Sequence, residues 1–141
     1  MLEMVRSDIL HIFNNAEKHS DNPFTVLAFH VDCYASFFKR NPAYGIVMLS
    51  ETGMNVSRQI KPFTNRLIDD TKLIIQRIIQ KGQKEKYFRN DILSDQLAFI
   101  YMSSLRFVLA KWYASEYEIS IQEECLKIWS SLQLLFSNKE A

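Results

Sequence analysis

Apolar residues recur at intervals of three and four over most of the chain, and this is the spacing of one face of an α-helix. In the first such segment, residues 2–19, the spaced positions are Val5, Ile9, Ile12, Phe13 and Ala16. The pattern returns in further segments, and none of them alternates convincingly as a half-buried strand does. The sequence therefore predicts about six helices, over residues 2–19, 23–40, 42–51, 55–81, 95–112 and 121–136.

Short polar segments between these helices carry residues that start helices. Asn22 and Asn41 each precede a proline. Asn suits the N-cap, and proline suits the first helical position, where no N–H is needed. Ser94 suits the cap of the next-to-last helix, and Ser120 with Glu123 forms a capping box before the last one.

The long helix predicted over residues 55–81 contains Pro62 and is followed by Gly82. A proline inside a helical pattern predicts either a kink or a later start. Gly82 fits a C-terminal cap, and Lys81 beside it suits the negative end of the helix dipole. We therefore expect this helix to end at about Lys81.

The last two predicted helices are apolar on more than one side. Residues 99–102 and 134–136 are runs of large apolar side chains. Consecutive residues of a helix point about 100° apart, so these runs cannot all face one core. Either both helices are central in a monomer, or two such helices from each of two subunits form a twofold four-helix bundle. The predicted dimer-interface residues are Leu97, Tyr101, Leu105, Val108, Trp112, Ile121, Cys125, Ile128, Leu132 and Phe136.

Composition fits one helical domain. The 141 residues are 48% apolar, with only 3 Gly and 3 Pro, too few turn formers for a β-rich fold. The 17 basic residues balance 16 acidic ones without a long basic run, so this segment alone is a poor candidate for binding nucleic acid. Cys33 and Cys125 lie far apart, and no signal peptide or membrane span is found. These features indicate a cytoplasmic protein with reduced thiols rather than a disulfide.

The sequence contains no recognisable constellation for catalysis or for a metal. His11, His19 and His30 do not stand at metal-ligand spacing, and no carboxylate cluster matches a metal cage. A nucleophile elbow, a P-loop and a dinucleotide-binding glycine motif are all missing. We therefore expect no enzymatic activity, no metal and no cofactor.

Arg106 stands between Leu105 and Phe107 in an otherwise apolar helix. An arginine in such a place must reach water, pair inside the protein, or meet an anion such as a ligand carboxylate or phosphate. Apolar residues at helical spacing either form plain core or line a cavity, since ligand cavities are also mostly apolar. The predicted ligand-binding residues are Tyr34, Met48, Phe63, Phe99, Met102 and Arg106.

One turn carries a resemblance to a known family. Residues 82–91 read Gly-x-x-x-x-Tyr-Phe-Arg-x-Asp, with Tyr87, Phe88, Arg89 and Asp91 after the glycine. This motif resembles the turn before the last two helices of tetracycline-repressor-type (TetR/AcrR) transcription regulators. In that family, ligand sensing and dimerisation reside in this C-terminal region.

Other passages extend the resemblance over nearly the whole chain. Phe37 and Phe38 before Pro42 are similar to the family's aromatic-Phe-x-x-x-Pro passage, and Trp112 matches an aromatic late in its first dimer helix. Residues 2–19 resemble the helix that connects the DNA-binding domain to the sensor. The family's helix-turn-helix, with its Tyr-x-x-Phe-x-x-Lys ending, is not found. We therefore expect either a sensor-domain fragment or a relative that lost its DNA-binding half.

The resemblance implies an all-α orthogonal bundle, in which residues 1–19 are a linker helix and residues 20–141 bind ligand and dimerise. It also implies a homodimer, a small hydrophobic or amphipathic effector, and contact with DNA only through the absent helix-turn-helix. Ligand would shift the population of two states and move the linker helix. The competing interpretation is an all-α dimeric protein-interaction module without a small-molecule ligand.

Overall fold

The computed structural model describes the backbone of residues 2–49 and 61–139, and within these ranges the side chains of residues 2–6, 9, 19, 47 and 61–64 lie outside the described part. Its helices are α1 (Leu2–His19), α2 (Pro23–Arg40), α3 (Pro42–Leu49), α4 (Lys61–Lys84), α5 (Ser94–Ala114) and α6 (Ile121–Phe136). No strand occurs in the described ranges, where an isolated bridge joins Phe88 to Ser137. The prediction of an all-α fold of about six helices is confirmed.

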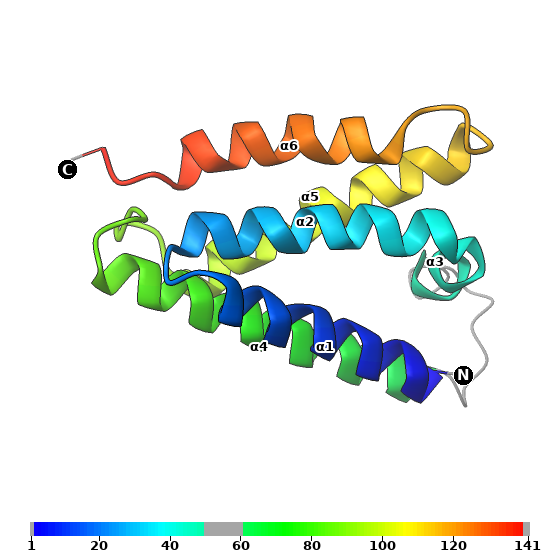
Figure 1. Ribbon diagram of the computed structural model, residues 1–141, viewed down its shortest axis with the longest axis horizontal. Helices are drawn as coiled ribbons and strands as arrows, with labels where there is room; N and C mark the ends of the chain where they lie inside the picture. Colours follow the sequence, from blue (N-terminus) through cyan, green and yellow to red (C-terminus); the bar gives the residue numbers. More distant parts are fainter. Residues whose placement is uncertain (1, 50–60, 140–141) are drawn as a thin grey trace.

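Helix α2 runs through the middle of the molecule, with α6 along one side and α1 and α4 along the other (Figure 1). Helix α5 crosses behind α2 and packs against both α4 and α6. The short helix α3 lies at the end of α2 and also contacts α5. Helix α2 is therefore flanked by α1 and α4 on one side and by α6 on the other, with α5 behind it.

Two of the predicted caps are confirmed. The Asn22 side chain accepts a hydrogen bond of 2.9 Å from the Phe24 N–H, with Pro23 at the first helical position. Ser120 accepts from the Glu123 N–H at 3.2 Å. The cap predicted at Ser94 is wrong, because α5 already includes this residue and Leu93 stands at the N-cap without a side-chain hydrogen bond.

The start of α4 is described from Lys61, so Pro62 stands in its first turn, where a missing N–H is tolerated. The predicted start at Asn55 lies outside the described residues, as does the predicted end of the preceding helix near Glu51. The described part of α3 ends at Leu49.

Gly82 does not act as the predicted C-terminal cap. Helix α4 continues through it to Lys84, and the left-handed conformation falls on Lys86, with φ 66°. The Tyr87 and Phe88 N–H groups both donate to the Gly82 carbonyl oxygen, at 2.8 and 3.2 Å, so the chain folds back over the helix end. A Cβ at Gly82 would overlap the Phe88 ring. The glycine is needed for this close approach rather than for a positive φ.

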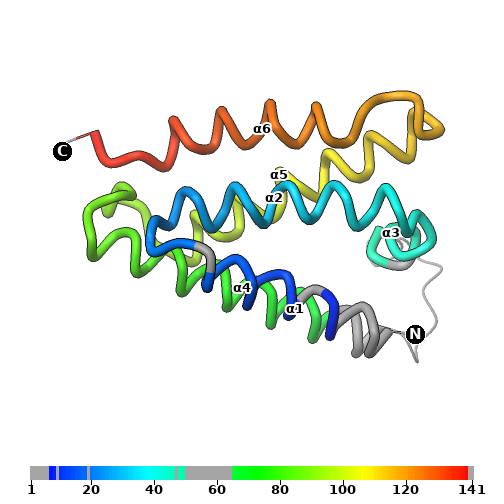
Figure 2. The backbone as a smooth tube through the Cα atoms, in the orientation of Figure 1, coloured from blue at the N-terminus to red at the C-terminus, as the bar shows by residue number. Residues whose placement is uncertain are grey.

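The same turn ties the end of α4 to the end of α6, as the backbone trace in Figure 2 shows. The Arg89 N–H donates to the Phe136 carbonyl oxygen at 2.8 Å, and the Asn138 N–H donates to that of Tyr87 at 3.0 Å. The Arg89 side chain pairs with Asp91 at 2.7 Å. This bond holds the pKa of the exposed Asp91 carboxyl below its usual value.

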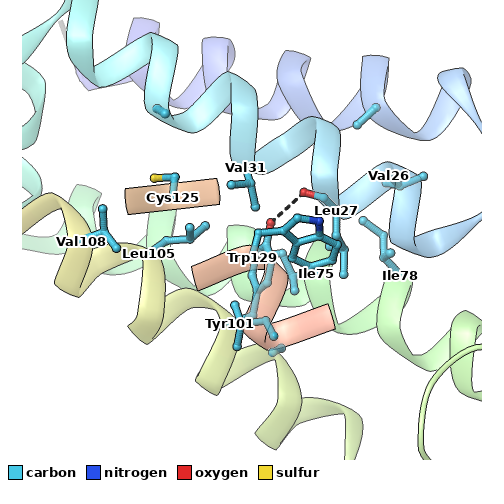
Figure 3. Packing of buried hydrophobic residues seen from close by; sticks show 14 of the residues in the cluster. Val26, Leu27, Val31, Ile75, Ile78, Tyr101, Leu105, Val108, Cys125 and Trp129 are labelled. Carbon is cyan, nitrogen blue, oxygen red and sulfur yellow. Dashed lines mark hydrogen bonds between the residues drawn. The ribbon is translucent and has the colours of Figure 1, made fainter. Parts of the chain in front are cut away.

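The hydrophobic core lies where α2, α4, α5 and α6 meet (Figure 3). Leu27 and Val31 of α2 are buried with Ile75 of α4, and Tyr101 of α5 is 0% exposed. The Tyr101 hydroxyl reaches the Leu27 carbonyl oxygen at 3.3 Å (Figure 3). From α6, the indole of Trp129 packs edge-on against the Tyr101 ring. Burial of these large side chains is the main term that stabilises the bundle.

Candidate functional site

A cavity of about 320 Å³ lies among α1, α2, α3, α4 and α5. Its wall is mostly apolar, and a few polar side chains reach it from three helices. From α2 come His30 and Tyr34, from α4 come Asp69 and Lys72, and from α5 comes Arg106. The remaining lining residues are Ile12, Phe37, Phe38, Met48, Ile68, Thr71, Ile75, Phe99, Met102, Ser103, Leu105 and Leu109.

The structure brings together most of the residues that the sequence predicted for ligand binding. Tyr34, Met48, Phe99, Met102 and Arg106 all line this cavity. Phe63 lies outside the residues whose side chains are described. The lining as a whole comes from segments up to about 97 positions apart in the sequence, from Ile12 to Leu109.

Arg106 has partners inside the protein. Its Nη2 donates to the Met48 carbonyl oxygen at 2.9 Å, near the C-terminal end of α3. A cation suits this end of a helix, where the last carbonyl groups lack N–H partners. Arg106 thereby links α5 to α3, which corresponds to the intramolecular alternative considered for this residue.

Tyr34 lies between the cavity and α5. Its hydroxyl donates to the Leu105 carbonyl oxygen at 3.4 Å. Burial raises the pKa of Tyr34 far above its usual value, with a smaller contribution in the same direction from Cys125, and the Arg106 charge opposes the shift. The phenol therefore remains a neutral hydrogen-bonding group.

His30 is the buried polar residue of the cavity, with only 5% of its surface exposed. Its Nδ1 lies 2.6 Å from the Tyr101 hydroxyl oxygen. Its ring stacks on Phe13 of α1, with the centroids 4.1 Å apart and the planes 16° from parallel. Burial lowers the pKa of His30 to about 3, so the imidazole is neutral at neutral pH. Sequence reasoning weighed His30 only as a metal ligand, because nothing local marked it as buried.

The charged side chains stand nearer the rim of the cavity. The Lys72 ammonium lies 5.9 Å from the centroid of the Phe99 ring, which is itself 58% exposed. Asp69 is exposed. The cavity therefore combines an apolar interior, one neutral imidazole and a charged rim. This arrangement suits a small apolar or amphipathic ligand.

The outer face of α5 and α6 is also apolar. Ile100 and Phe107 of α5 and Leu135 of α6 are exposed, and Phe107 is 71% exposed. Two shallow hollows on this face are bordered by Phe107, Val108 and Ile128 together with serine and charged residues. An apolar area of this kind commonly marks a contact with another chain.

Most of the residues predicted from sequence for a dimer interface turn toward the chain's own helices. Both faces are apolar, so the helical spacing could not tell which one turns inward. Val108 and Ile128 border the surface hollows. The others are buried against the chain's own helices and have no surface left for a partner: Leu97, Tyr101, Leu105, Trp112, Ile121, Cys125, Leu132 and Phe136.

Within the described residues, no group of three or more His, Cys, Asp or Glu side chains is placed to hold a metal ion. None of the described helices is long and apolar enough to cross a membrane. Cys33 and Cys125 are both free thiols.

Comparison with known proteins relates this architecture to a class of regulators. No protein-family model matches the sequence, and no curated protein matches it significantly. Among solved structures, the chain is similar to the crystal structure of the MbdR regulator from Azoarcus sp. CIB, a TetR-family regulator. The TM-score is 0.84 at 20% sequence identity, and the match covers 94% of this chain and 71% of that chain. The chain therefore has the fold of a TetR-type regulator.

Proposed function

We propose that this chain is the effector-sensing and dimerisation domain of a TetR-type transcriptional regulator. The observation that carries the proposal is the cavity of about 320 Å³ enclosed by helices of a regulator fold. Its apolar lining suits a small hydrophobic or amphipathic ligand. A separate helix-turn-helix domain would bind the DNA. The regulator would act in the cytoplasm, and we propose no catalytic activity for this chain.

Contacts of α1 with the cavity support a sensing mechanism. Ile12 lines the cavity, and Phe13 stacks on His30 at its wall. A ligand that binds one position of α1 better than another shifts the population toward that position. DNA half-sites lie about 34–36 Å apart, so a small movement of α1, acting as the linker, would change how two DNA-binding heads fit them.

The exposed face of α5 and α6 supports a twofold homodimer. Ile100, Phe107, Val108 and Ile128 form an apolar strip that crosses both helices, and Ser103 among them leaves room for a facing side chain. Two copies of this face would form the four-helix bundle expected for the last two helices. The most exposed of these side chains is Phe107, so it is the residue whose substitution tests the interface most directly.

Native mass spectrometry of the purified chain tests both parts of the proposal. We expect a dimer that carries a co-purified small molecule. Phe107→Glu should convert the dimer to a monomer, because it would place two carboxylates in an apolar interface. Leu73→Glu is the matched control, since Leu73 is also exposed but lies on α4. A monomeric wild-type chain would contradict the dimer, and a Phe107→Glu dimer would exclude this face.

The second candidate function is a dimeric protein-interaction module without a small-molecule ligand. The exposed apolar face of α5 and α6 favours it, since such a face also suits a protein partner. A clean dimer without an adduct, which also fails to bind small apolar compounds, would favour this second function.

A further inference from the structure

His30 brings a polar group into the apolar interior of the cavity. Its Nδ1 has the Tyr101 hydroxyl as partner, and no partner for its Nε2 is found among the described residues. In the described part of the chain, the hydroxyl of Tyr113 is the side-chain atom that is fully enclosed without a partner. His30 keeps 5% of its surface exposed, and the space that it borders is the cavity.

The length of the bond to Tyr101 indicates which tautomer the imidazole adopts. A separation of 2.6 Å between Nδ1 and the hydroxyl oxygen suits a hydroxyl donor. It is shorter than the range of about 2.7–3.2 Å expected for an N–H donor. The same hydroxyl lies 3.3 Å from the Leu27 carbonyl oxygen, and this longer contact competes less well for its single proton. The shorter contact favours donation to Nδ1, which leaves the ring proton on Nε2.

We propose that the Tyr101 hydroxyl donates to Nδ1 of His30, that the Nε2–H of His30 donates a hydrogen bond to the ligand, and that the ligand is an apolar molecule with a neutral oxygen acceptor, such as a ketone, ester or amide carbonyl. This inference rests on the proposed sensing function and specifies the chemistry of the same cavity. A buried N–H that a ligand leaves unpaired reduces affinity, so this group selects for an acceptor.

The surroundings of His30 favour a neutral acceptor over a carboxylate. Burial lowers the pKa of the imidazole to about 3, so the ring offers a dipole and no charge. The cations lie elsewhere along the lining, with Lys72 over the exposed Phe99 ring and Arg106 donating to Met48. A carboxylate moved into the apolar interior would lose its hydration without meeting a positive partner at His30.

His30 also connects the cavity to two other helices. Its ring stacks on Phe13 of α1, and its Nδ1 is bonded to Tyr101 of α5. A ligand that binds Nε2 therefore acts on a side chain that contacts α1, α5 and the cavity together. Under the proposed mechanism, His30 would bind the acceptor and couple this binding to the position of α1.

Three naphthalene probes of similar shape test the proposal by isothermal titration calorimetry. They are 2-acetylnaphthalene, which has the carbonyl, 2-isopropenylnaphthalene, which replaces its oxygen by CH₂, and 2-naphthoate, which is an anion. The wild-type chain should bind the ketone about fivefold more tightly than the alkene, as expected for one buried hydrogen bond. His30→Phe should reduce this ratio to about one, while retaining an aromatic ring against Phe13. His11→Phe, at an exposed position of α1, should leave the ratio unchanged.

Each alternative result has a distinct meaning. Saturable binding of ketone and alkene with equal affinity in the wild type would overturn the role of His30 and leave the cavity as the ligand site. Tighter His30-dependent binding of 2-naphthoate than of the ketone would overturn the neutral acceptor. Saturable binding of none of the three probes would overturn the proposed sensing function itself.

A measurement on the wild-type chain keeps the test independent of how His30→Phe folds. Long-range ¹H–¹⁵N correlation spectra distinguish the imidazole tautomers directly. We expect neutral His30 with its proton on Nε2, and a change in the Nε2 resonance when 2-acetylnaphthalene binds. A proton on Nδ1, or an imidazolium at neutral pH, would refute the donor role.

Discussion

Acidification should destabilise the protein through His30. The side chain is 5% exposed, and burial lowers its pKa from 6.5 to about 3. In the unfolded chain the imidazole is hydrated and takes up a proton at its ordinary pKa of about 6.5. Between these two values the unfolded state binds more protons than the folded state. The free energy of unfolding therefore falls as the pH drops below about 6.5.

The size of this effect follows from the two pKa values. A pH of about 5 lies about 1.5 units below the unfolded pKa, and each unit corresponds to about 1.4 kcal/mol. Because the folded ring is still neutral there, a change from about pH 7.5 to about pH 5 should lower the free energy of unfolding by about 2 kcal/mol. The pKa of Asp91 is held low by its bond to Arg89. The contribution of this ion pair to stability is therefore lost only at more acidic pH, where the Asp91 carboxyl takes up a proton.

Urea unfolding followed by circular dichroism at both pH values measures this difference. His30→Phe removes the titrating group, so its loss of stability on acidification should be about 2 kcal/mol smaller than that of the wild type. His11→Phe removes a histidine from an exposed position of α1 and should behave as the wild type does. If His30→Phe loses as much stability on acidification as the wild type does, the buried neutral imidazole is not the cause of that loss.

Two further substitutions test the local structure by the same unfolding assay. Gly82→Ala should destabilise by about 1–3 kcal/mol, because its Cβ would overlap the Phe88 ring, and an unchanged stability would contradict the close approach. Ser120→Ala should cost about 1 kcal/mol, because the Glu123 N–H loses its cap. Ser94→Ala should cost much less, since Ser94 does not cap α5, and equal losses for the two serines would contradict this difference.

The helices could be predicted because their signals are local. The Asn22 cap and the proline after it lie within one turn of the N–H groups that they affect, so the start of α2 at Pro23 can be read from adjacent residues. The spacing of apolar residues likewise identified α1 over Leu2–His19. Ser94 shows the limit of such signals, because a residue that suits a cap is also tolerated inside the first turn.

The candidate site was only partly predictable. Arg106 was selected because a charge in an apolar helix is unusual, and Met102 because apolar residues at helical spacing can line a cavity. Both line the cavity. His30 was missed as a cavity residue because its partners, Phe13 and Tyr101, lie 17 and 71 positions away in the sequence. Nothing near His30 in the sequence marks it as buried.

The sequence by itself determined the all-α class, most helix bounds and the apolar character of α5 and α6, since each depends on residues within a few turns of one another. The tertiary structure decided which apolar face turns inward, so that Tyr101 is buried while Ile100 is exposed. It also decided that Gly82 makes room for Phe88. The physical reason is that burial is a property of contacts between distant segments, and a helical pattern that is apolar on both sides leaves the choice of face to the other helices.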